Sequence, residues 1–360
     1  MSTVAPAKSR IPSAPLQRAI DSFDETAARG FLAAASIGLL TRDSVAALKA
    51  DLDLCWSGRR DPVDYDPIYE STRASYAALV GVPVERVATG SQTSVLVSVI
   101  AAAAPDGAEV LCVDGDFSSV VFPFLQHSGI RVRSVPLNAL ADSITEQTWL
   151  VAFSLAQSAT GQIADTAAIT EAARRSGAYT LCDTTQAAGV YPVAAGDFDA
   201  TVCHAYKWLC CPRGVAFLTL SERFDRTLTP VQAGWYAGDS VWDSCYAPDM
   251  HLASTARRFD VSPVWHAWVG AEPAVRMFAA LDLHEVWDYA SGLGDMLCDA
   301  LEVPEQHQAI VTWADPDGHD LARLTAAGIT VTGRAGRMRA SFHLWNNESD
   351  VRAAAHALGR

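Results

Sequence analysis

The chain has no apolar stretch long enough to cross a lipid bilayer. Its longest one spans residues 95–104 and contains Ser98, whereas a membrane-spanning helix needs about 20 apolar residues. Half of the 360 residues are hydrophobic, so we expect this stretch to be a buried helix of a globular protein. Residues 1–20 have no apolar core either. We expect a flexible segment there, no cleavable signal peptide, and a cytoplasmic protein without a membrane role.

Clusters of Lys and Arg are also missing. The 27 basic residues are outnumbered by 41 acidic ones, which gives a formal net charge of −14. Binding to nucleic-acid phosphates relies on clustered positive charge, so the composition argues against a nucleic-acid partner. A small anionic ligand held in a local pocket stays compatible with it.

The eight cysteines show neither a disulfide framework nor paired CxxC motifs. Several lie in segments that we predict to be strands, which favours buried, reduced thiols of a cytosolic protein. Cys203, His204, Cys210 and Cys211 are close in sequence, but their spacing does not match a zinc knuckle, and cysteine is often buried. We therefore expect no metal.

The two common nucleotide-binding motifs, GxGxxG and GxxxxGKS/T, are absent as well. Their absence disfavours an NAD- or nucleotide-binding protein, which is the main alternative from a different functional class. Internal repeats and low-complexity blocks are also missing. We therefore expect the functional side chains to be single residues at the ends of predicted strands and helices.

Strand-like and helix-like segments alternate between residues 60 and 220, which is typical of an α/β fold with a mostly parallel sheet. Strands are predicted over 109–113, 131–135, 149–154, 179–183, 200–204 and 215–220, and helices over 67–80, 120–126 and 165–176. After residue 250 we predict a helical region at 272–301, strands at 310–313, 329–332 and 338–344, and helices at 321–327 and from 348. The length suits a large domain, 21–265, whose N-terminal part packs on a smaller α+β domain, 266–360.

Lys207 and Asp183 offer the two groups that pyridoxal phosphate (PLP) chemistry requires. Asp183 ends a predicted strand, and Lys207 follows the next one. A lysine amine holds the PLP aldehyde as a Schiff base, and a carboxylate keeps the pyridine nitrogen protonated so that the ring accepts electrons. In parallel sheets ligands gather at the carboxyl ends of strands, so the positions also favour PLP over two unrelated charges.

Other residues at strand or helix ends could complete a PLP site. Ser91, Gln92 and Thr93 precede a helix whose free NH groups suit a phosphate, although an ordinary helix-capping turn would look the same. Phe117 could stack on the pyridine ring or simply be a core residue.

Polar residues near the predicted strand ends add further candidates. Gln186 is a neutral donor suited to the phenolic oxygen of PLP, and Gln157 and Ser158 could donate to that oxygen or to substrate, or close a turn. His204 and Tyr206 flank the lysine, and Tyr206 could reach the phosphate. Arg339, on a late strand, could bind a substrate carboxylate with its two-pronged guanidinium or lie on the surface.

Read in order, the segments GSQTS, GDFSS, CDTTQ, YKWLCCPRG and MRASFHLWNN resemble the class V aminotransferase family of fold type I PLP enzymes over residues 60–358. The resemblance implies that Lys207 is the Schiff-base lysine and Asp183 the pyridinium partner. It also implies that Arg339 holds the substrate α-carboxylate. The same fold implies a homodimer with active sites at the interface, where Trp235 would reach the neighbour's phosphate.

Within the family, the chain is more similar to the isopenicillin N epimerase-like and kynureninase-like branch than to cysteine desulfurases. The stretch before Arg339, AGITVTGRAGRMRAS, has no cysteine to serve as their nucleophile. The resemblance implies a PLP enzyme that removes the Cα proton of an α-amino acid. We favour an aminotransferase, with a β-lyase (C–S lyase) or an amino-acid epimerase as alternatives.

Overall fold

The computed structural model describes residues 12–246, 251–334 and 336–360. Within these residues, strands form one seven-stranded and one three-stranded sheet. The strands are β1 (Val87–Gly90), β2 (Glu109–Val113), β3 (Arg131–Val135), β4 (Thr148–Ser154), β5 (Tyr179–Asp183), β6 (Ala200–His204), β7 (Ala216–Leu220), β8 (Ile310–Ala314), β9 (Thr332–Arg334) and β10 (Arg337–Ser341).

The larger sheet has the strand order β1-β7-β6-β5-β4-β2-β3. Neighbouring strands from β3 to β6 are parallel, whereas β7 runs antiparallel to both β6 and β1. The predicted α/β fold with a mostly parallel sheet is therefore confirmed. The short runs 109–113, 179–183 and 200–204 are strands with the predicted bounds, because each has apolar residues at its centre and is buried on both faces except at Tyr179.

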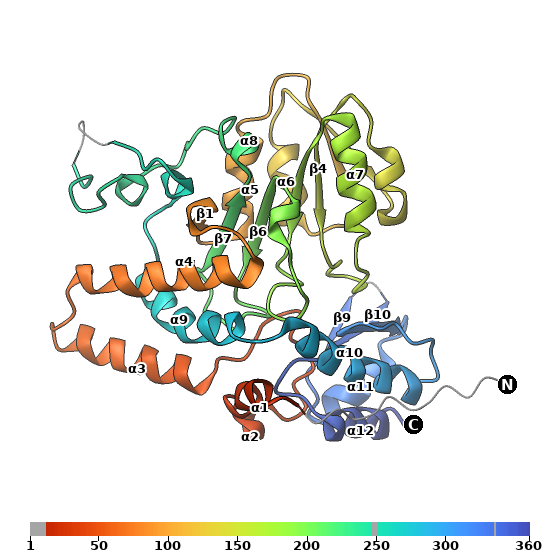
Figure 1. Ribbon diagram of the computed structural model, residues 1–360. Helices are drawn as coiled ribbons and strands as arrows, with labels where there is room; N and C mark the ends of the chain where they lie inside the picture. Colours follow the sequence, from red (N-terminus) through yellow and green to blue (C-terminus); the bar gives the residue numbers. More distant parts are fainter. Residues whose placement is uncertain (1–11, 247–250, 335) are drawn as a thin grey trace.

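Helices cover both faces of this sheet, and further helices surround the smaller one (Figure 1). They are α1 (Ala14–Asp21), α2 (Glu25–Ala28), α3 (Arg42–Trp56), α4 (Asp66–Val80), α5 (Thr93–Ala101), α6 (Ser118–Leu125), α7 (Thr166–Ser176), α8 (Glu222–Asp225), α9 (Trp265–Ala279), α10 (Leu283–Ala300), α11 (His319–Ala326) and α12 (Glu348–Ala357). No helix of the described residues is both long and apolar enough to cross a membrane.

Side chains alternate between two apolar cores on the two faces of the large sheet. Leu111 and Val113 of β2 face one core, whereas Val110 and Cys112 face the other. A third core lies between the small sheet and the helices α10 and α12. All eight cysteines are free thiols, and six of them are buried.

Local sequence signals explain where α7 begins and ends. Asp165, expected as the cap, accepts a hydrogen bond from the backbone NH of Ala168. Gly177 ends the helix with a φ of 75°, in the left-handed region that glycine tolerates. Such paired signals fix the length of the helix before β5, which carries Asp183.

Four predictions about secondary structure need correction. Residues 14–20, expected to be flexible, belong to α1, which Ser13 caps and which buries Leu16; residues 1–11 lie outside the described residues. The helical region 272–301 is two helices, α9 and α10, because Asp282 caps a new helix. The strand expected at 329–332 is β9, which begins three residues later than predicted. The strand expected at 338–344 is β10, which ends at Ser341.

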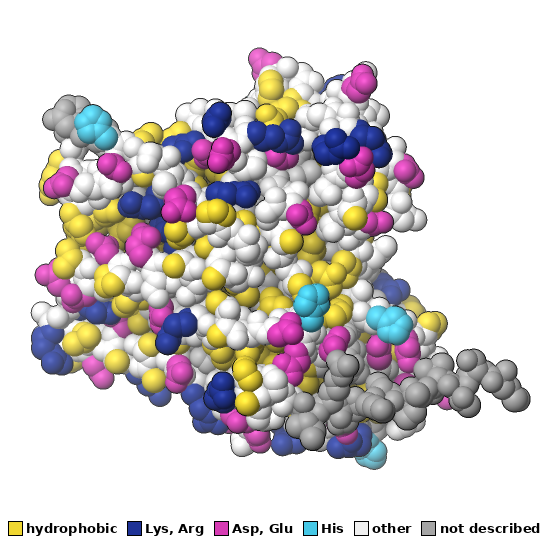
Figure 2. All heavy atoms as spheres, viewed as in Figure 1, with side chains coloured by type: hydrophobic (Ala, Val, Ile, Leu, Met, Phe, Trp, Pro, Cys, Tyr) yellow, Lys and Arg dark blue, Asp and Glu magenta, His cyan; other side chains and the backbone are white. Residues whose placement is uncertain are grey.

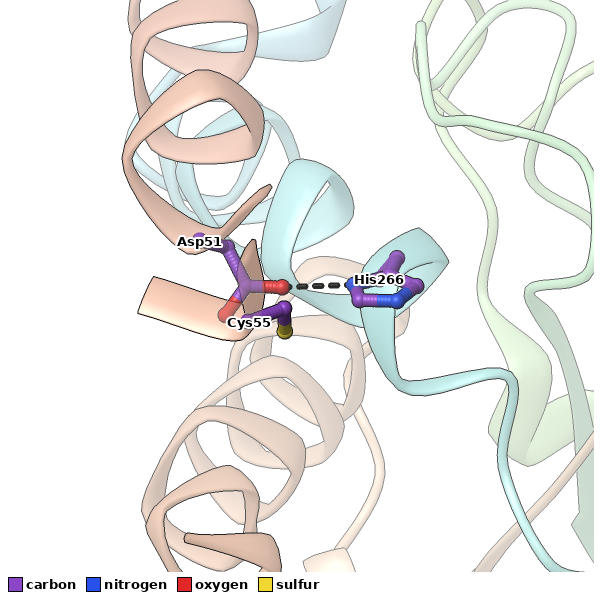
Figure 3. A group of neighbouring side chains, drawn as sticks. All are labelled: Asp51, Cys55 and His266. Atoms are coloured by element: carbon purple, nitrogen blue, oxygen red, sulfur yellow. Dashed lines mark hydrogen bonds and ion pairs between the residues drawn. The ribbon is translucent and has the colours of Figure 1, made fainter. Parts of the chain in front are cut away.

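Helices α3 and α9 are joined by a polar contact between Asp51 and His266 (Figure 3). The buried Asp51 carboxylate accepts a 2.7 Å hydrogen bond from His266 Nδ1, and Cys55 lies one helical turn further along α3. Arg60 already holds the other carboxylate oxygen at 2.5 Å. Because this guanidinium supplies the positive charge that the carboxylate needs, we interpret the group as a clamp between two helices.

Acidic and basic side chains are intermixed on the face shown in Figure 2. Basic residues also form ion pairs along helices, such as Arg174 with Glu171 in α7. Positive charge is therefore not gathered into a patch on this face, in keeping with the acidic composition.

Candidate active site

The carboxyl ends of three parallel strands meet at one edge of the large sheet. Ser154 at the end of β4 pairs in register with Asp183 at the end of β5, and β6 ends alongside at His204. Lys207 lies three residues beyond β6. Asp183 and Lys207 are only 3 % and 4 % exposed, and each lies close enough for its charge to act on the other, so the structure brings the two charges together in a buried place.

Burial raises the pKa of Asp183 to about 6, and hydrogen bonds from Thr185 and the charge of Lys207 oppose this shift. The Thr185 backbone NH donates to Asp183 Oδ1 at 2.8 Å. A carboxyl with a raised pKa and a fixed orientation is suited to hold a proton shared with a ligand nitrogen. The positive charge of a protonated pyridine would in turn favour its ionised form.

Burial also lowers the pKa of Lys207 to about 8. The Asp183 charge opposes the shift, whereas the positive charges of Arg339 and Arg213 strengthen it. A substantial fraction of the amine is therefore unprotonated just above neutral pH, as a nucleophile or base requires. The Nζ atom lies 5.1 Å from the ring centroid of Phe117 and 5.6 Å from that of Tyr206.

Lysine is rare in this chain, which contains only Lys8, Lys49 and Lys207. Lys49 is exposed on α3, and Lys8 lies outside the described residues. Lys207 is thus buried whereas Lys49 is exposed to solvent. Burying a lysine without a partner for its charge costs folding free energy, so a buried lysine is usually paired or catalytic.

A second group of polar atoms lies beside the start of α5. Gln92 precedes this helix but gives no side-chain cap, so its first backbone NH groups are available to a ligand. The hydroxyls of Thr93 and Thr185 are 3.5 Å apart, and Thr185 also accepts from the backbone NH of His204. Ser91 and Gln92 are more exposed than Thr93.

His204 carries an unusual buried atom in this group. Its Nε2 finds no hydrogen-bond partner among the described residues. Burial lowers the pKa of His204 to about 4, with help from the charges of Arg213 and Lys207, so the ring is neutral. An unsatisfied buried nitrogen costs stability, and a phosphate oxygen bound at the α5 terminus would give it a partner.

Asp116 positions Phe117, whose backbone NH donates to Asp116 Oδ1 at 2.7 Å, and this role was not predicted from the sequence. Its carboxylate accepts from the backbone NH and hydroxyl of Ser154, at 2.8 and 2.6 Å, and from Gln157 Nε2 at 3.3 Å. These bonds tie the loop after β2 to the end of β4. The available signal was a carboxylate three residues after a strand, in the segment VDGDF.

Gln157 therefore uses its amide within the protein, on Asp116 and on the carbonyl oxygen of Ser154. Gln186 is also engaged. Its Nε2 donates to the carbonyl oxygen of Ala35 and to Ser158 Oγ, and its Oε1 accepts from Trp208 Nε1 at 2.7 Å. Both amides have defined orientations before any ligand binds.

Arg339 reaches the same edge from β10. Its Nη1 donates to the carbonyl oxygen of Ser158 at 2.5 Å and to Ser158 Oγ at 3.2 Å, and its Nη2 donates to Ser36 Oγ at 2.7 Å. Ser36 and Ala35 belong to a segment whose role was not predicted from the sequence. Nothing in their local sequence marks them, because their partners lie more than 150 residues away.

Tyr206 and Trp235 are placed differently. The Tyr206 ring packs against His204, with 4.4 Å between ring centroids, and under the guanidinium of Arg213 at 4.5 Å. Trp235 instead joins an aromatic cluster with Tyr236, Trp242 and Trp265. The ring contacts found for Trp235 lie in that cluster and not with Lys207.

The residues present fit PLP. The buried pair Asp183 and Lys207 provides the carboxylate and the amine, the α5 terminus and the unsatisfied His204 Nε2 suit the phosphate, and the Phe117 ring lies beside the amine. Together with the mostly parallel sheet, this arrangement defines the class of fold type I PLP-dependent enzymes.

The family follows from comparison with known proteins. The family model described as aminotransferase class-V matches residues 64–324. This covers well over half of the chain, so the protein belongs to the class V aminotransferase family, whose members depend on PLP.

Two curated relatives are similar in sequence. The uncharacterized aminotransferase YcbU of Bacillus subtilis is 26 % identical over 232 residues, which are 61 % of each chain. A kynureninase of Deinococcus radiodurans is 27 % identical over 252 residues, which are 66 % of this chain and 60 % of that protein. The chain thus spans about three-fifths of the length of the curated relatives it matches.

Solved structures share the fold at low sequence identity. The cysteine desulfurase CsdA of Escherichia coli matches with a TM-score of 0.83 and 20 % identity, over 97 % of this chain and 98 % of that one. The cystine C–S lyase C-DES matches with a TM-score of 0.82 and 17 % identity, over 93 % and 99 %. The expected separation from cysteine desulfurases is therefore not borne out by the structural neighbours.

Proposed function

We propose that this protein is a PLP-dependent enzyme that removes the Cα proton of an α-amino acid, with Lys207 as the base, and that it transfers the amino group to a keto acid. The observation that carries the proposal is the buried pair of Lys207 and Asp183, with Arg339 directed to the same edge. When bound, PLP supplies an aldehyde that condenses with amines and a ring that accepts electrons.

The protein would hold the cofactor with residues from several elements. Asp183 would hold the proton on the pyridine nitrogen and Phe117 would stack on the ring. Gln186 would contact the ring oxygen in exchange for its bond to Ser158 Oγ. Ser91, Gln92, Thr93, His204 and Tyr206 would bind the phosphate, and Trp235 of a second copy would reach it in a homodimer. The unpartnered His204 Nε2 supports the phosphate assignment most directly.

The substrate would bind through its carboxylate to Arg339, with Gln157 and Ser158 beside it. A guanidinium offers two parallel donors that match the two carboxylate oxygens. The raised fraction of neutral amine on Lys207, whose pKa is lowered to about 8, supports its role as the base for the Cα proton.

Transamination is supported by the family and by the relative named as an aminotransferase. The test is a panel of amino acids mixed with the PLP-loaded protein, with and without a keto acid. We expect conversion of the cofactor to its pyridoxamine form and its return when keto acid is added. Pyruvate and ammonia would instead identify β-elimination, and a racemic amino acid would identify epimerisation.

Substitutions test the residue roles. Lys207→Ala is expected to lower turnover at least about a hundredfold, because it removes the base, whereas the exposed Lys49→Ala is the matched control. Arg339→Ala is expected to raise KM for amino acids roughly a hundredfold, and Arg337→Ala on the same strand is its control. Full turnover by Lys207→Ala, or an unchanged KM in Arg339→Ala, would refute the respective role.

A further inference from the structure

Residues 33–38, here called the N-terminal strap, run from the small sheet to the Lys207 loop. At one end, Ala33 forms a bridge with Ser341, and the backbone NH of Ala35 donates to Ser341 Oγ at 2.9 Å. At the other end, the NH of Gly38 donates to the carbonyl oxygen of Tyr206 at 2.9 Å. The strap thus connects the strand that carries Arg339 with the loop that carries Lys207.

The strap lies in direct backbone contact with the lysine. A Cβ atom added to Gly38 would lie 1.9 Å from the carbonyl oxygen of Lys207 and 3.1 Å from the Cα atom of Cys210. Real Cβ atoms do not come this close to backbone, so only glycine fits at this position. The position of the strap is therefore fixed relative to Lys207.

Ser36 brings a hydroxyl onto the Arg339 side chain. Its Oγ accepts from Arg339 Nη2 at 2.7 Å and lies 3.0 Å from Thr332 Oγ1. A hydroxyl has one hydrogen and two lone pairs. Because Ser36 accepts from Arg339, its own hydrogen is available to Thr332 or to an acceptor that arrives beside the guanidinium.

We propose that Ser36 is a substrate-positioning residue, which holds Nη2 of Arg339 and donates its hydrogen to the α-carboxylate of the bound amino acid. This inference rests on the proposed function, because it requires that Arg339 binds the carboxylate. Without substrate, Ser36 donates its hydrogen to the hydroxyl of Thr332. When substrate binds, the carboxylate takes the place of Thr332, so the Ser36 hydroxyl has an acceptor with and without substrate.

The predicted consequence is a selective change in substrate binding. Ser36→Ala removes a hydrogen bond to a charged group, so we expect KM for the amino acid to rise about tenfold. We expect kcat to stay within about twofold, because the carboxylate does not react. Ser36→Thr keeps the hydroxyl and is expected to restore KM.

Two comparisons separate this role from a structural one. Thr332→Val removes the other hydroxyl beside Ser36 and keeps the shape of the side chain at the position of β9 that pairs with Arg339. If Ser36 only tied the strap to the small sheet, Thr332→Val would raise KM as much as Ser36→Ala, and the inference would be overturned. The second comparison adds Ser36→Ala to Arg339→Ala, where loss of the direct bond from Ser36 to the carboxylate should raise KM further, whereas a residue that only holds Arg339 would have no further effect.

A binding measurement provides a readout independent of turnover. The probe is a 2-methyl amino acid, which has no Cα proton to lose, titrated into the PLP-loaded protein by calorimetry. Ser36→Ala should weaken its binding about tenfold and leave binding of the matching amine, which lacks the carboxylate, unchanged.

The outcomes distinguish this inference from the proposed function. An unchanged KM and unchanged binding in Ser36→Ala, together with a raised KM in Arg339→Ala, would overturn the role of Ser36 and leave the proposed function intact. An unchanged KM in Arg339→Ala would overturn the carboxylate site, and the role of Ser36 with it. Equal losses for the amino acid and the amine would also contradict the inference.

Discussion

At the scale of single residues, the site depends on charges that share a buried place. Burial shifts the pKa of Lys207 down and that of Asp183 up, so each group is less strongly charged than it would be in water. Their mutual attraction opposes both shifts, and the nearby Arg339 strengthens the one on Lys207. The environment therefore lowers the pKa of Lys207 and makes its amine a better nucleophile near neutral pH.

The pKa of Lys207 predicts how PLP enters the cofactor-free protein. Only the unprotonated amine attacks an aldehyde, so the rate of incorporation should rise with pH and level off above a midpoint near 8. Asp183→Asn removes the charge that raises this pKa, and the midpoint should move to lower pH. The rate is measured from the growth of the visible absorption band, and a midpoint near the ordinary 10.5 would contradict the prediction.

His204 allows a separate test of the phosphate end. His204→Ala removes the unpartnered Nε2, so the affinity for PLP should fall about tenfold. Affinity for pyridoxal, which has no phosphate, should stay the same, and the exposed His356→Ala serves as control. Equal losses for PLP and pyridoxal, measured by fluorescence titration, would place the phosphate elsewhere.

At the scale of elements, the ends of short buried strands position most of the site. Asp183 and His204 are the last residues of β5 and β6, and Ser154 is the last residue of β4. Side chains at such ends point to the cleft that a parallel sheet opens. The N-terminal strap adds a contact of another kind, between backbone segments far apart in sequence.

Gly38 gives the strap a measurable effect on stability. Gly38→Ala forces a Cβ against the carbonyl oxygen of Lys207, so we expect a loss of about 2 to 4 kcal/mol in the free energy of unfolding. Gly292 in α10 has no atom within 4 Å of an added Cβ, and Gly292→Ala should be neutral or stabilising by up to about 1 kcal/mol. Denaturant unfolding measures the stabilities of the two variants. Equal stabilities would show that the strap moves to make room for the added Cβ.

Much of this arrangement was predictable from sequence because it is local. Two buried runs, one ending at Asp183 and one just before Lys207, predict their own strands and thereby the positions of the two charges. The strap was not predictable, because Ser36 meets Arg339 across 303 positions in the chain. The strand expected at 329–332 was placed too early, since Thr330 pairs only with Phe31 in an isolated bridge.

At the scale of the whole molecule, the strap, Arg339 and the Lys207 loop connect two sheets around one edge. We propose that residues 21–265 and 266–360 are two domains and that the enzyme is a homodimer. In this arrangement, Trp235 of one subunit would act in the site of the other. The aromatic cluster around Trp235 would then lie near the interface.

Mixed dimers test the position of Trp235. Homodimers of Lys207→Ala chains and homodimers of Trp235→Ala chains should both have little or no activity. In a hybrid, the intact Lys207 of one chain meets the intact Trp235 of the other, so activity should return to about half per dimer. The hybrid is isolated by differential tagging. Failure to regain activity would show that Trp235 acts within its own subunit, and a fully active Trp235→Ala homodimer would show that it has no role in the site.

The most direct test of the proposed role of Lys207 is to locate the lysine that holds PLP. The protein is incubated with PLP, reduced with borohydride to fix the cofactor on its lysine, digested and analysed by mass spectrometry. The three lysines make the result unambiguous. We predict one stable adduct per chain, on Lys207, which disappears in Lys207→Ala. An adduct mainly on Lys49 or Lys8, or none at all, would contradict the role of Lys207.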